Sequence, residues 1–154
     1  MLPVKSLGVS IFLLKPDGPE TRVLLLRRTG KHLNGQWCQI AGGIETGETA
    51  WQTALREVRE ETGIELTEIW SADVLEQFYE PERECINVMP VFVSKVAENT
   101  EVTLNDEHDA YEWVNFEEAH TMLGFSGQQK VLAAVKAEFV DKAPNPHLRI
   151  EMNG

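Results

Sequence analysis

Residues 42–64 decide the fold, and they read GGIETGETAWQTALREVREETGI. The first third of this stretch is rich in glycine, which is typical of a loop. Apolar residues then follow at the i, i+3, i+4 and i+7 spacing of an amphipathic helix: Trp51, Ala54, Leu55 and Val58. Thr49 with Gln52 forms a capping box at the start, and Gly63 stands where a C-cap glycine belongs. The stretch therefore predicts a glycine-rich loop that leads into an α-helix.

Three glutamates share one face of this predicted helix, next to its apolar stripe. Glu57, Glu60 and Glu61 are separated by three and four positions, so their side chains are neighbours. Exposed like charges at this spacing repel by a few tenths of a kcal/mol, that is roughly 0.2–0.5 per pair. The nearby cations, Arg56 and Arg59, lie one position off that face. The face is either a plain acidic surface or a site for a hard divalent cation, which prefers oxygen ligands.

The loop before the helix favours the metal-site interpretation. Gly42 and Gly43 allow a close approach of main-chain carbonyls to an ion or ligand. Glu48 precedes Arg56 by eight residues, too many for a pair within one helix. An ion pair between them across the loop–helix junction would brace the loop and orient the carboxylates.

The stretch resembles the Nudix box, the signature of the Nudix (MutT-like) hydrolases, written G-x5-E-x7-R-E-U-x-E-E-x-G-U with U aliphatic. Every specified position matches at the correct spacing: Gly42, Glu48, Arg56, Glu57, Val58, Glu60, Glu61, Gly63 and Ile64. One departure is that the Pro-Gly-Gly common at the start of the box is Ala41-Gly42-Gly43 here. Loss of that proline changes the rigidity of the loop and leaves the metal ligands intact, so it bears on substrate choice.

The segments around the box predict one α/β domain. Strands are expected at residues 7–14, 23–26, 37–41, 66–78, 85–96 and 111–114, and further helices at 116–123 and 128–140. The resemblance implies an α/β/α sandwich with a mixed β-sheet. We assign residues 1–143 to a single Nudix hydrolase domain. Residues 144–154 are expected to be a mobile C-terminal tail, because two prolines end regular structure there.

Composition narrows the class of protein. A chain of 154 residues is the size of one domain. Its net charge of −11 argues against broad nucleic-acid binding and against anionic membranes. We expect a cytoplasmic protein, because no signal-peptide pattern and no apolar run of about 20 residues is present. Cys38 and Cys85 are expected to be buried free thiols.

The resemblance also implies an activity and a cofactor. Nudix hydrolases cleave a nucleoside diphosphate linked to another group, with Mg²⁺ or Mn²⁺. The resemblance implies that Glu57, Glu60 and Glu61 bind the metals, and that a main-chain carbonyl of Gly42 or Gly43 adds a ligand. Metals in such a site neutralise phosphate charge and activate water.

The general base is left open between two sources. Family members take it from a box glutamate or from an acidic residue on a later loop, and Glu107 is our choice for the loop acid. A plain acidic surface loop is the alternative for Glu107, and the adjacent His108 is either a phosphate or base contact or a loop histidine without a role. The predicted catalytic set is Glu48, Arg56, Glu57, Glu61 and Glu107, with Glu48 and Arg56 as supports.

Substrate contacts are predicted outside the box. Arg27 ends a strand and offers a forked, charge-assisted contact to phosphate. Strand alternation sends Arg28 to the opposite face, and the sequence leaves open which of the two faces the phosphates. Trp37 and Phe78, or its neighbour Tyr79, are candidates for stacking on a base, with a plain core role as the alternative. Gln128 and Gln129 are further, weaker candidates on the last helix.

The loop around Glu107 resembles those of two Nudix groups. These are the dATP/dihydroneopterin-triphosphate pyrophosphohydrolases and the diadenosine-polyphosphate hydrolases. The leading expectation is cleavage of a (d)NTP-like nucleotide to the monophosphate and pyrophosphate. The alternatives are a dinucleoside-polyphosphate or RNA 5′-end hydrolase, and a non-catalytic module that senses a nucleotide. Intact box glutamates argue against the sensor. The resemblance also makes a homodimer one possible oligomeric state, since dimers are frequent among relatives.

Overall fold

The computed structural model describes residues 1–152, and a mixed β-sheet forms its centre. The strands are β1 (Val4–Lys5), β2 (Gly8–Asp17), β3 (Glu20–Arg28), β4 (Trp37–Cys38), β5 (Ile40–Gly43), β6 (Trp70–Glu80), β7 (Cys85–Lys95) and β8 (His108–Val114). The helices are α1 (Ala50–Thr62), α2 (Phe116–Met122), α3 (Ser126–Phe139) and the short 3-10 helix η1 (Pro146–Leu148). The main path of the sheet is β1-β7-β2-β3-β4, while β5 pairs with β2, β6 with β7 and β8 with β3. Strand β7 runs parallel to β1 and β2, and the other named pairs are antiparallel.

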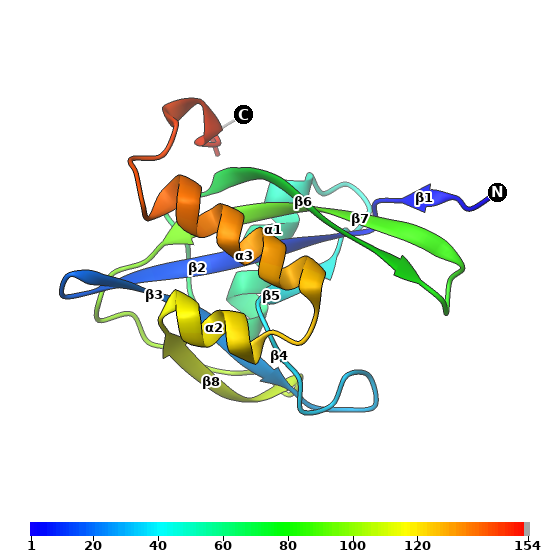
Figure 1. Ribbon diagram of the computed structural model, residues 1–154, viewed down its shortest axis with the longest axis horizontal. Helices are drawn as coiled ribbons and strands as arrows, with labels where there is room; N and C mark the ends of the chain where they lie inside the picture. The colour runs from blue at the N-terminus through cyan, green and yellow to red at the C-terminus, as the bar shows by residue number, and fades with distance from the viewer. Residues whose placement is uncertain (153–154) are drawn as a thin grey trace.

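Two apolar cores lie on opposite faces of the sheet. Because successive side chains of a strand alternate, Phe12 and Leu14 of β2 enter the core under α2 and α3, whereas Ile11 and Leu13 enter the core under α1. Figure 1 shows α2 and α3 in front of the sheet and α1 behind it. The predicted α/β/α sandwich with a mixed sheet is confirmed.

Helix α1 begins and ends where its capping residues predict. The hydroxyl of Thr49 accepts a hydrogen bond from the amide of Gln52 at 3.2 Å, and the Gln52 side chain accepts one from the amide of Thr49 at 2.9 Å. Gly63 caps the C-terminus with φ at 72°, in the left-handed region that favours glycine. The two caps fix the ends of α1 and therefore the positions of Glu57, Glu60 and Glu61 on it.

Several element boundaries differ from the sequence prediction. Strand β2 continues to Asp17, and Gly18, with φ at 60°, makes the tight turn to β3. Strand β6 begins only at Trp70, because Leu66 and Ile69 pack into the α1 core from an irregular connection. The apolar residues of this connection led to the prediction of a strand that begins at residue 66, whereas β6 begins at Trp70.

The segment after residue 143 packs against the domain as far as the structure describes it. The amide of Ile150 donates to the carbonyl of Ile69 at 3.0 Å, and Ile150 and Met152 join the core under α1. The segment expected to be a mobile tail thus contacts the domain through Ile150 and Met152. Residues 153–154 of the predicted tail lie outside the described residues.

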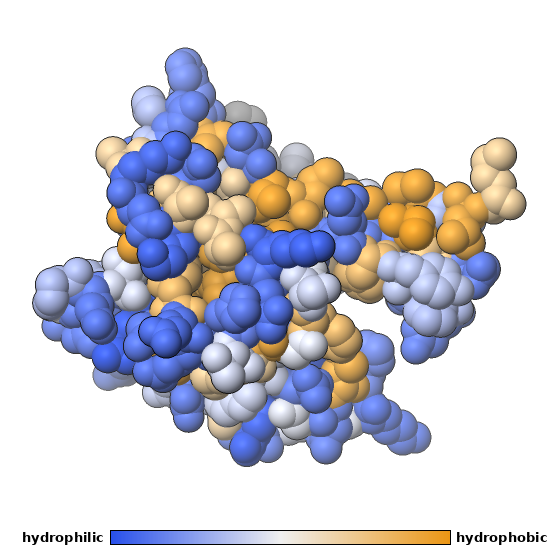
Figure 2. Space-filling model, in the orientation of Figure 1, coloured by the Kyte–Doolittle hydropathy of each residue, from blue (hydrophilic) through white to orange (hydrophobic). Residues whose placement is uncertain are grey.

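The β6–β7 hairpin projects from the body of the molecule as an arm (Figure 1). Its exposed apolar side chains include Leu75, Phe78 and Tyr79, and Figure 2 shows apolar surface gathered on this arm. The surface is hollowed between the arm and the part of the molecule that contains β4 (Figure 2).

Two smaller expectations can also be compared with the structure. Cys38 and Cys85 are both buried and free, as predicted. Within residues 1–152, none of the helices combines the length and the apolar character that a membrane crossing needs.

Candidate active site

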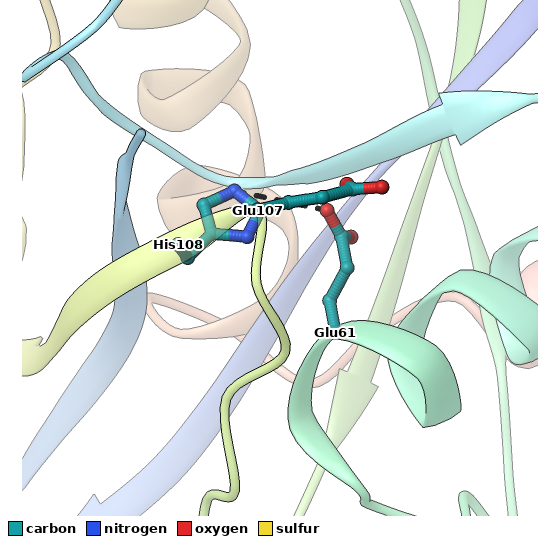
Figure 3. A group of neighbouring side chains, drawn as sticks. All are labelled: Glu61, Glu107 and His108. Carbon is teal, nitrogen blue, oxygen red and sulfur yellow. Dashed lines mark ion pairs between the residues drawn. The ribbon is translucent and has the colours of Figure 1, made fainter. Parts of the chain in front are cut away.

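A buried acidic group lies where α1 meets the start of β8. Glu61 projects from the last turn of α1 toward Glu107 and His108 (Figure 3). One potential ligand atom from each of these three residues lies within 4.8 Å of the other two. The loop that carries Glu107 is held against the end of β3, because the amide of Thr29 donates to the Glu107 carbonyl at 2.9 Å. Two segments separated by more than forty residues thus meet at one point.

Burial makes this group electrostatically unusual. Glu61 is 2% exposed, and among the described residues its Oε2 atom has no hydrogen-bond partner. Burial, reinforced by the charges of Glu57 and Glu107, raises the pKa of Glu61 to about 9, while the charge of Arg28 opposes the shift. Burial and the Arg28 charge lower the pKa of His108. A carboxylate oxygen without a partner, in a group that burial keeps from ionising, fits a divalent cation as the missing charge.

Arg56 ties the glycine-rich loop to α1. Its Nε lies 2.7 Å from Glu48 Oε2, and its Nη2 donates to the Gly43 carbonyl at 2.8 Å. Its Nη1 donates to Glu57 Oε1 at 2.8 Å and to Glu60 Oε2 at 3.2 Å. The predicted ion pair between Glu48 and Arg56 is therefore present. One guanidinium positions the loop and two of the box glutamates together.

The ion pair makes Glu48 a source of acid sensitivity. The Arg56 hydrogen bond, followed by one from the Glu45 amide, lowers the pKa of Glu48 from 4.5 to about 2 in the folded protein. A depressed folded-state pKa adds to the free energy of unfolding above pH 4.5, and this contribution is lost as the pH falls toward 2.

We therefore expect Glu48→Gln to flatten the pH dependence of stability. Urea unfolding at neutral pH and near pH 3, roughly midway through that window, should show a smaller loss for Glu48→Gln than for the wild type. The matched control is Glu65→Gln at an exposed position, which should lose as much as the wild type. An equal loss of unfolding free energy in all three proteins would contradict the assignment of acid sensitivity to the Glu48–Arg56 ion pair.

Gly42 provides the space that Glu57 occupies. A Cβ atom built on Gly42 would collide with the Glu57 carboxyl group and its Cγ. A Cβ on Gly43 would meet only the Leu7 carbonyl oxygen, at 3.8 Å. The Gly43 carbonyl already accepts from Arg56, so of the two predicted carbonyl ligands Gly43 is engaged within the loop.

The predicted metal ligands differ in their surroundings. The side chains of Glu57 and Glu61 are 12% and 3% exposed, whereas that of Glu60 is 51% exposed. Burial raises the pKa of Glu57, and the Arg56 hydrogen bond opposes this shift. Glu57 and Glu61 are therefore the box carboxylates that face inward, and Glu60 stands at the rim.

Arg27 and Arg28 point to opposite faces of the sheet, as alternation predicts. Arg27 pairs with Asp109 at 2.7 Å and lies over the Trp37 ring, 5.8 Å from its centroid. Arg28 instead stands opposite His108 in the β3–β8 pairing, and its charge opposes the upward shift of the Glu61 pKa. Of the two arginines, Arg28 is thus the one near the acidic group.

The other predicted substrate residues lie outside the group of Glu61, Glu107 and His108. Trp37 is half-buried and packs against the core under α2 and α3, and Phe78 is 43% exposed on the β6–β7 arm. Tyr79, the alternative to Phe78, is 50% exposed and donates its hydroxyl to Glu84 at 2.6 Å. Trp37 therefore packs on the α3 side of the sheet, while Phe78 and Tyr79 are exposed on the arm.

A second buried polar network was not predicted from the sequence. Gln39 donates to Ser10 Oγ and to Glu76 Oε1, at 2.8 Å each, and accepts from Gln128 at 3.2 Å. Gln128, a weak candidate in the sequence, therefore contacts this network, while Gln129 caps carbonyls at the end of α2. The available signal was Glu76, a charged residue in the inward register of a strand. The network joins β2, β6 and α3.

The comparison with protein families agrees with this geometry. The model of the NUDIX domain matches residues 4–139 of the chain. The chain belongs to the Nudix family. The fold and the box that carry this Nudix identity are therefore those predicted from the sequence.

Curated relatives of this Nudix hydrolase differ in how much of their length it covers. An octanoyltransferase of Myxococcus xanthus is 36% identical over 84% of the chain, but the chain spans only 36% of that protein. An asymmetrical bis(5′-nucleosyl)-tetraphosphatase of Mus musculus is 30% identical over 85% of the chain and 92% of that protein. Nucleoside triphosphatase NudI of Escherichia coli is 36% identical over 54% of the chain and 64% of that protein. Two of these three relatives are thus named for acting on nucleotides.

Solved structures show the same fold. An Ap4A hydrolase of Caenorhabditis elegans in a binary complex has a TM-score of 0.76 at 20% identity, covering 88% of this chain and 98% of that chain. The dihydroneopterin triphosphate pyrophosphohydrolase of Escherichia coli has a TM-score of 0.72 at 20% identity, covering 92% of this chain and 100% of that chain. At this identity the likeness establishes the fold.

Proposed function

We propose that this Nudix hydrolase cleaves the phosphoanhydride of a (d)NTP-like nucleotide, releasing a nucleoside monophosphate and pyrophosphate. The observation that carries the proposal is the buried Glu61 carboxyl group, which lies beside Glu107 and His108 and next to the loop that Arg56 braces. A buried acidic group costs stability unless a cation compensates it. Mg²⁺ or Mn²⁺ is the proposed cofactor.

The inward-facing carboxylates are the proposed ligands. Glu57 and Glu61 would hold the metal, with Glu60 at the rim and the Gly42 carbonyl as a further ligand. The metal would supply charge neutralisation for phosphate oxygens and activation of water. Arg56 supports this arrangement because it fixes the Glu57 carboxylate through a hydrogen bond of 2.8 Å.

Glu107 is the proposed acceptor of the proton from the attacking water. It is exposed, lies within reach of the Glu61 group, and its backbone is fixed to Thr29. A group placed this way can accept a proton directly or through one water molecule. A box glutamate remains the competing general base.

The nucleoside end is proposed to occupy the hollow beside the β6–β7 arm (Figure 2). Phe78 is exposed on that arm, and Trp37 offers a second aromatic surface. Stacking of a base on an aromatic ring contributes about 1–3 kcal/mol per base. Arg27, although paired with Asp109, stays a predicted phosphate contact, with Arg28 as the arginine nearer the acidic group.

A dinucleoside polyphosphate is the second candidate substrate. The specific observation in its favour is the likeness to the mouse tetraphosphatase, which covers nearly the whole of both chains. Both candidates share one chemistry, since each has a phosphoanhydride next to a nucleoside. The choice between them concerns which groups flank that bond.

Product identification separates the candidates. The protein would be incubated with Mg²⁺ and a panel of (d)NTPs, dinucleoside tetraphosphates and an RNA with a 5′-triphosphate, and the products separated by anion exchange. Release of pyrophosphate and a monophosphate from a (d)NTP is the expected result. Asymmetric splitting of the dinucleotide alone would support the second candidate. Tight nucleotide binding without turnover would favour a sensor and overturn the proposal.

A further inference from the structure

We propose that His108 supplies a nitrogen ligand to the cation of the acidic group, so that the site favours Co²⁺ and Mn²⁺ over Mg²⁺. This inference rests on the metal-dependent activity proposed above and goes beyond it, because the Nudix box supplies only oxygen ligands. His108 is the first residue of β8 and lies opposite Arg28 of β3.

The separation of the two nearest atoms suits a shared cation. The His108 Nε2 atom lies 3.7 Å from Glu61 Oε1 (Figure 3), which is too long for a hydrogen bond. Ligand bonds of about 2.1 Å place two atoms on one metal roughly 3 Å apart at a right angle and about 4 Å apart on opposite sides. The observed distance falls between these limits. Glu107 lies at the same point, with one carboxylate oxygen within 4.8 Å of an atom of each of the other two residues.

Burial shows that the group is built rather than incidental. The side chains of His108 and Glu61 are 2% and 3% exposed. His108 Nδ1 and Glu61 Oε2 both lack a hydrogen-bond partner within residues 1–152. Buried polar atoms without partners are rare in native proteins, and bound ions are one of the accepted reasons for them. The unpartnered Oε2 atom of Glu61, in a carboxyl group that faces the His108 ring, therefore points to a ligand at this group.

A nitrogen donor alters which metals bind best. Mg²⁺ is bound almost entirely through oxygen, whereas imidazole is a good ligand for transition metals. Affinity at a mixed nitrogen and oxygen site rises from Mn²⁺ to Co²⁺. His108 would therefore strengthen binding of Co²⁺ most, Mn²⁺ less and Mg²⁺ least.

The test is pulsed EPR on the full-length protein with substoichiometric Mn²⁺. The technique detects ¹⁴N nuclei bonded directly to the metal. The chain has four histidines, and the other three, His32, His120 and His147, are exposed. The triple variant His32→Asn, His120→Asn, His147→Asn keeps His108 as its one histidine. The ¹⁴N modulation should persist in this variant and disappear in His108→Asn.

Metal titration by calorimetry gives the second readout. His108→Asn should weaken Co²⁺ binding at least about tenfold while changing Mg²⁺ binding far less. An equal loss for both metals would mean that His108 only positions Glu61, and this would overturn the proposal. Bound Mn²⁺ without ¹⁴N modulation in the triple variant would overturn it as well, while leaving the proposed activity intact. Absence of any Mn²⁺ binding would instead overturn the metal-dependent activity itself.

Discussion

Glu61→Gln is expected to lower turnover about a thousandfold, because a metal ligand contributes several kcal/mol to stabilising the transition state. Glutamine keeps the shape of the side chain and removes its negative charge. Glu61 is 2% exposed, and its carboxyl group has no cationic hydrogen-bond donor among the described residues. In the proposed mechanism the charge therefore serves a bound cation rather than a structural ion pair. Steady-state kinetics at saturating Mg²⁺ measures the loss.

A matched control separates this effect from the loss of one negative charge elsewhere on the chain. Glu65 lies four residues beyond Glu61, after the C-cap of α1, and is exposed. Glu65→Gln removes the same charge from the chain and should leave turnover within about twofold, since exposed substitutions away from a site have little effect. If Glu61→Gln kept turnover within tenfold of the wild type, Glu61 would not be a metal ligand.

Gly42→Ala is expected to lower turnover about a hundredfold by displacing Glu57. The new Cβ would collide with the Glu57 carboxyl group, so the side chain must leave its position. Misplacing a catalytic group by about 1 Å can cost on the order of a hundredfold. Overpacking should also lower the free energy of unfolding, by about 1–3 kcal/mol.

The adjacent glycine provides the control for this change. At Gly43 a Cβ atom has no neighbour closer than the Leu7 carbonyl oxygen, at 3.8 Å. Gly43→Ala should therefore retain most of the activity, although both substitutions add the same methyl group to the same strand. Turnover and urea unfolding measured on both variants give the comparison. Similar activity in the two proteins would contradict the steric role assigned to Gly42.

The sequence predicted the part of the site that is encoded locally. Spacing along one helix placed Glu57, Glu60 and Glu61 on a common face, and Thr49 and Gly63 marked the ends of that helix. The ion pair between the loop and the helix was also predictable, because the loop is short. In these cases the interacting groups are close in sequence, so periodicity and turn chemistry suffice.

Contacts between distant segments were harder to predict. Local sequence patterns could not predict that β8 brings His108 against Glu61, since strand order depends on packing of the whole sheet. The choice between Arg27 and Arg28 depended on the pairing of β3 with β8, which sets Arg28 opposite His108. The network of Gln39 and Glu76 likewise depends on the pairing of β6 with β7. Long-range register, rather than local propensity, decides all three.

The central claim is that this Nudix hydrolase splits a nucleotide phosphoanhydride with a divalent cation held at Glu61. The most direct test is quantification of products from a (d)NTP, with Mg²⁺ and with a chelator, for the wild type and Glu61→Gln. The account predicts stoichiometric monophosphate and pyrophosphate from the wild type with Mg²⁺, and almost none in the other three reactions. Undiminished product formation in the presence of the chelator would contradict it.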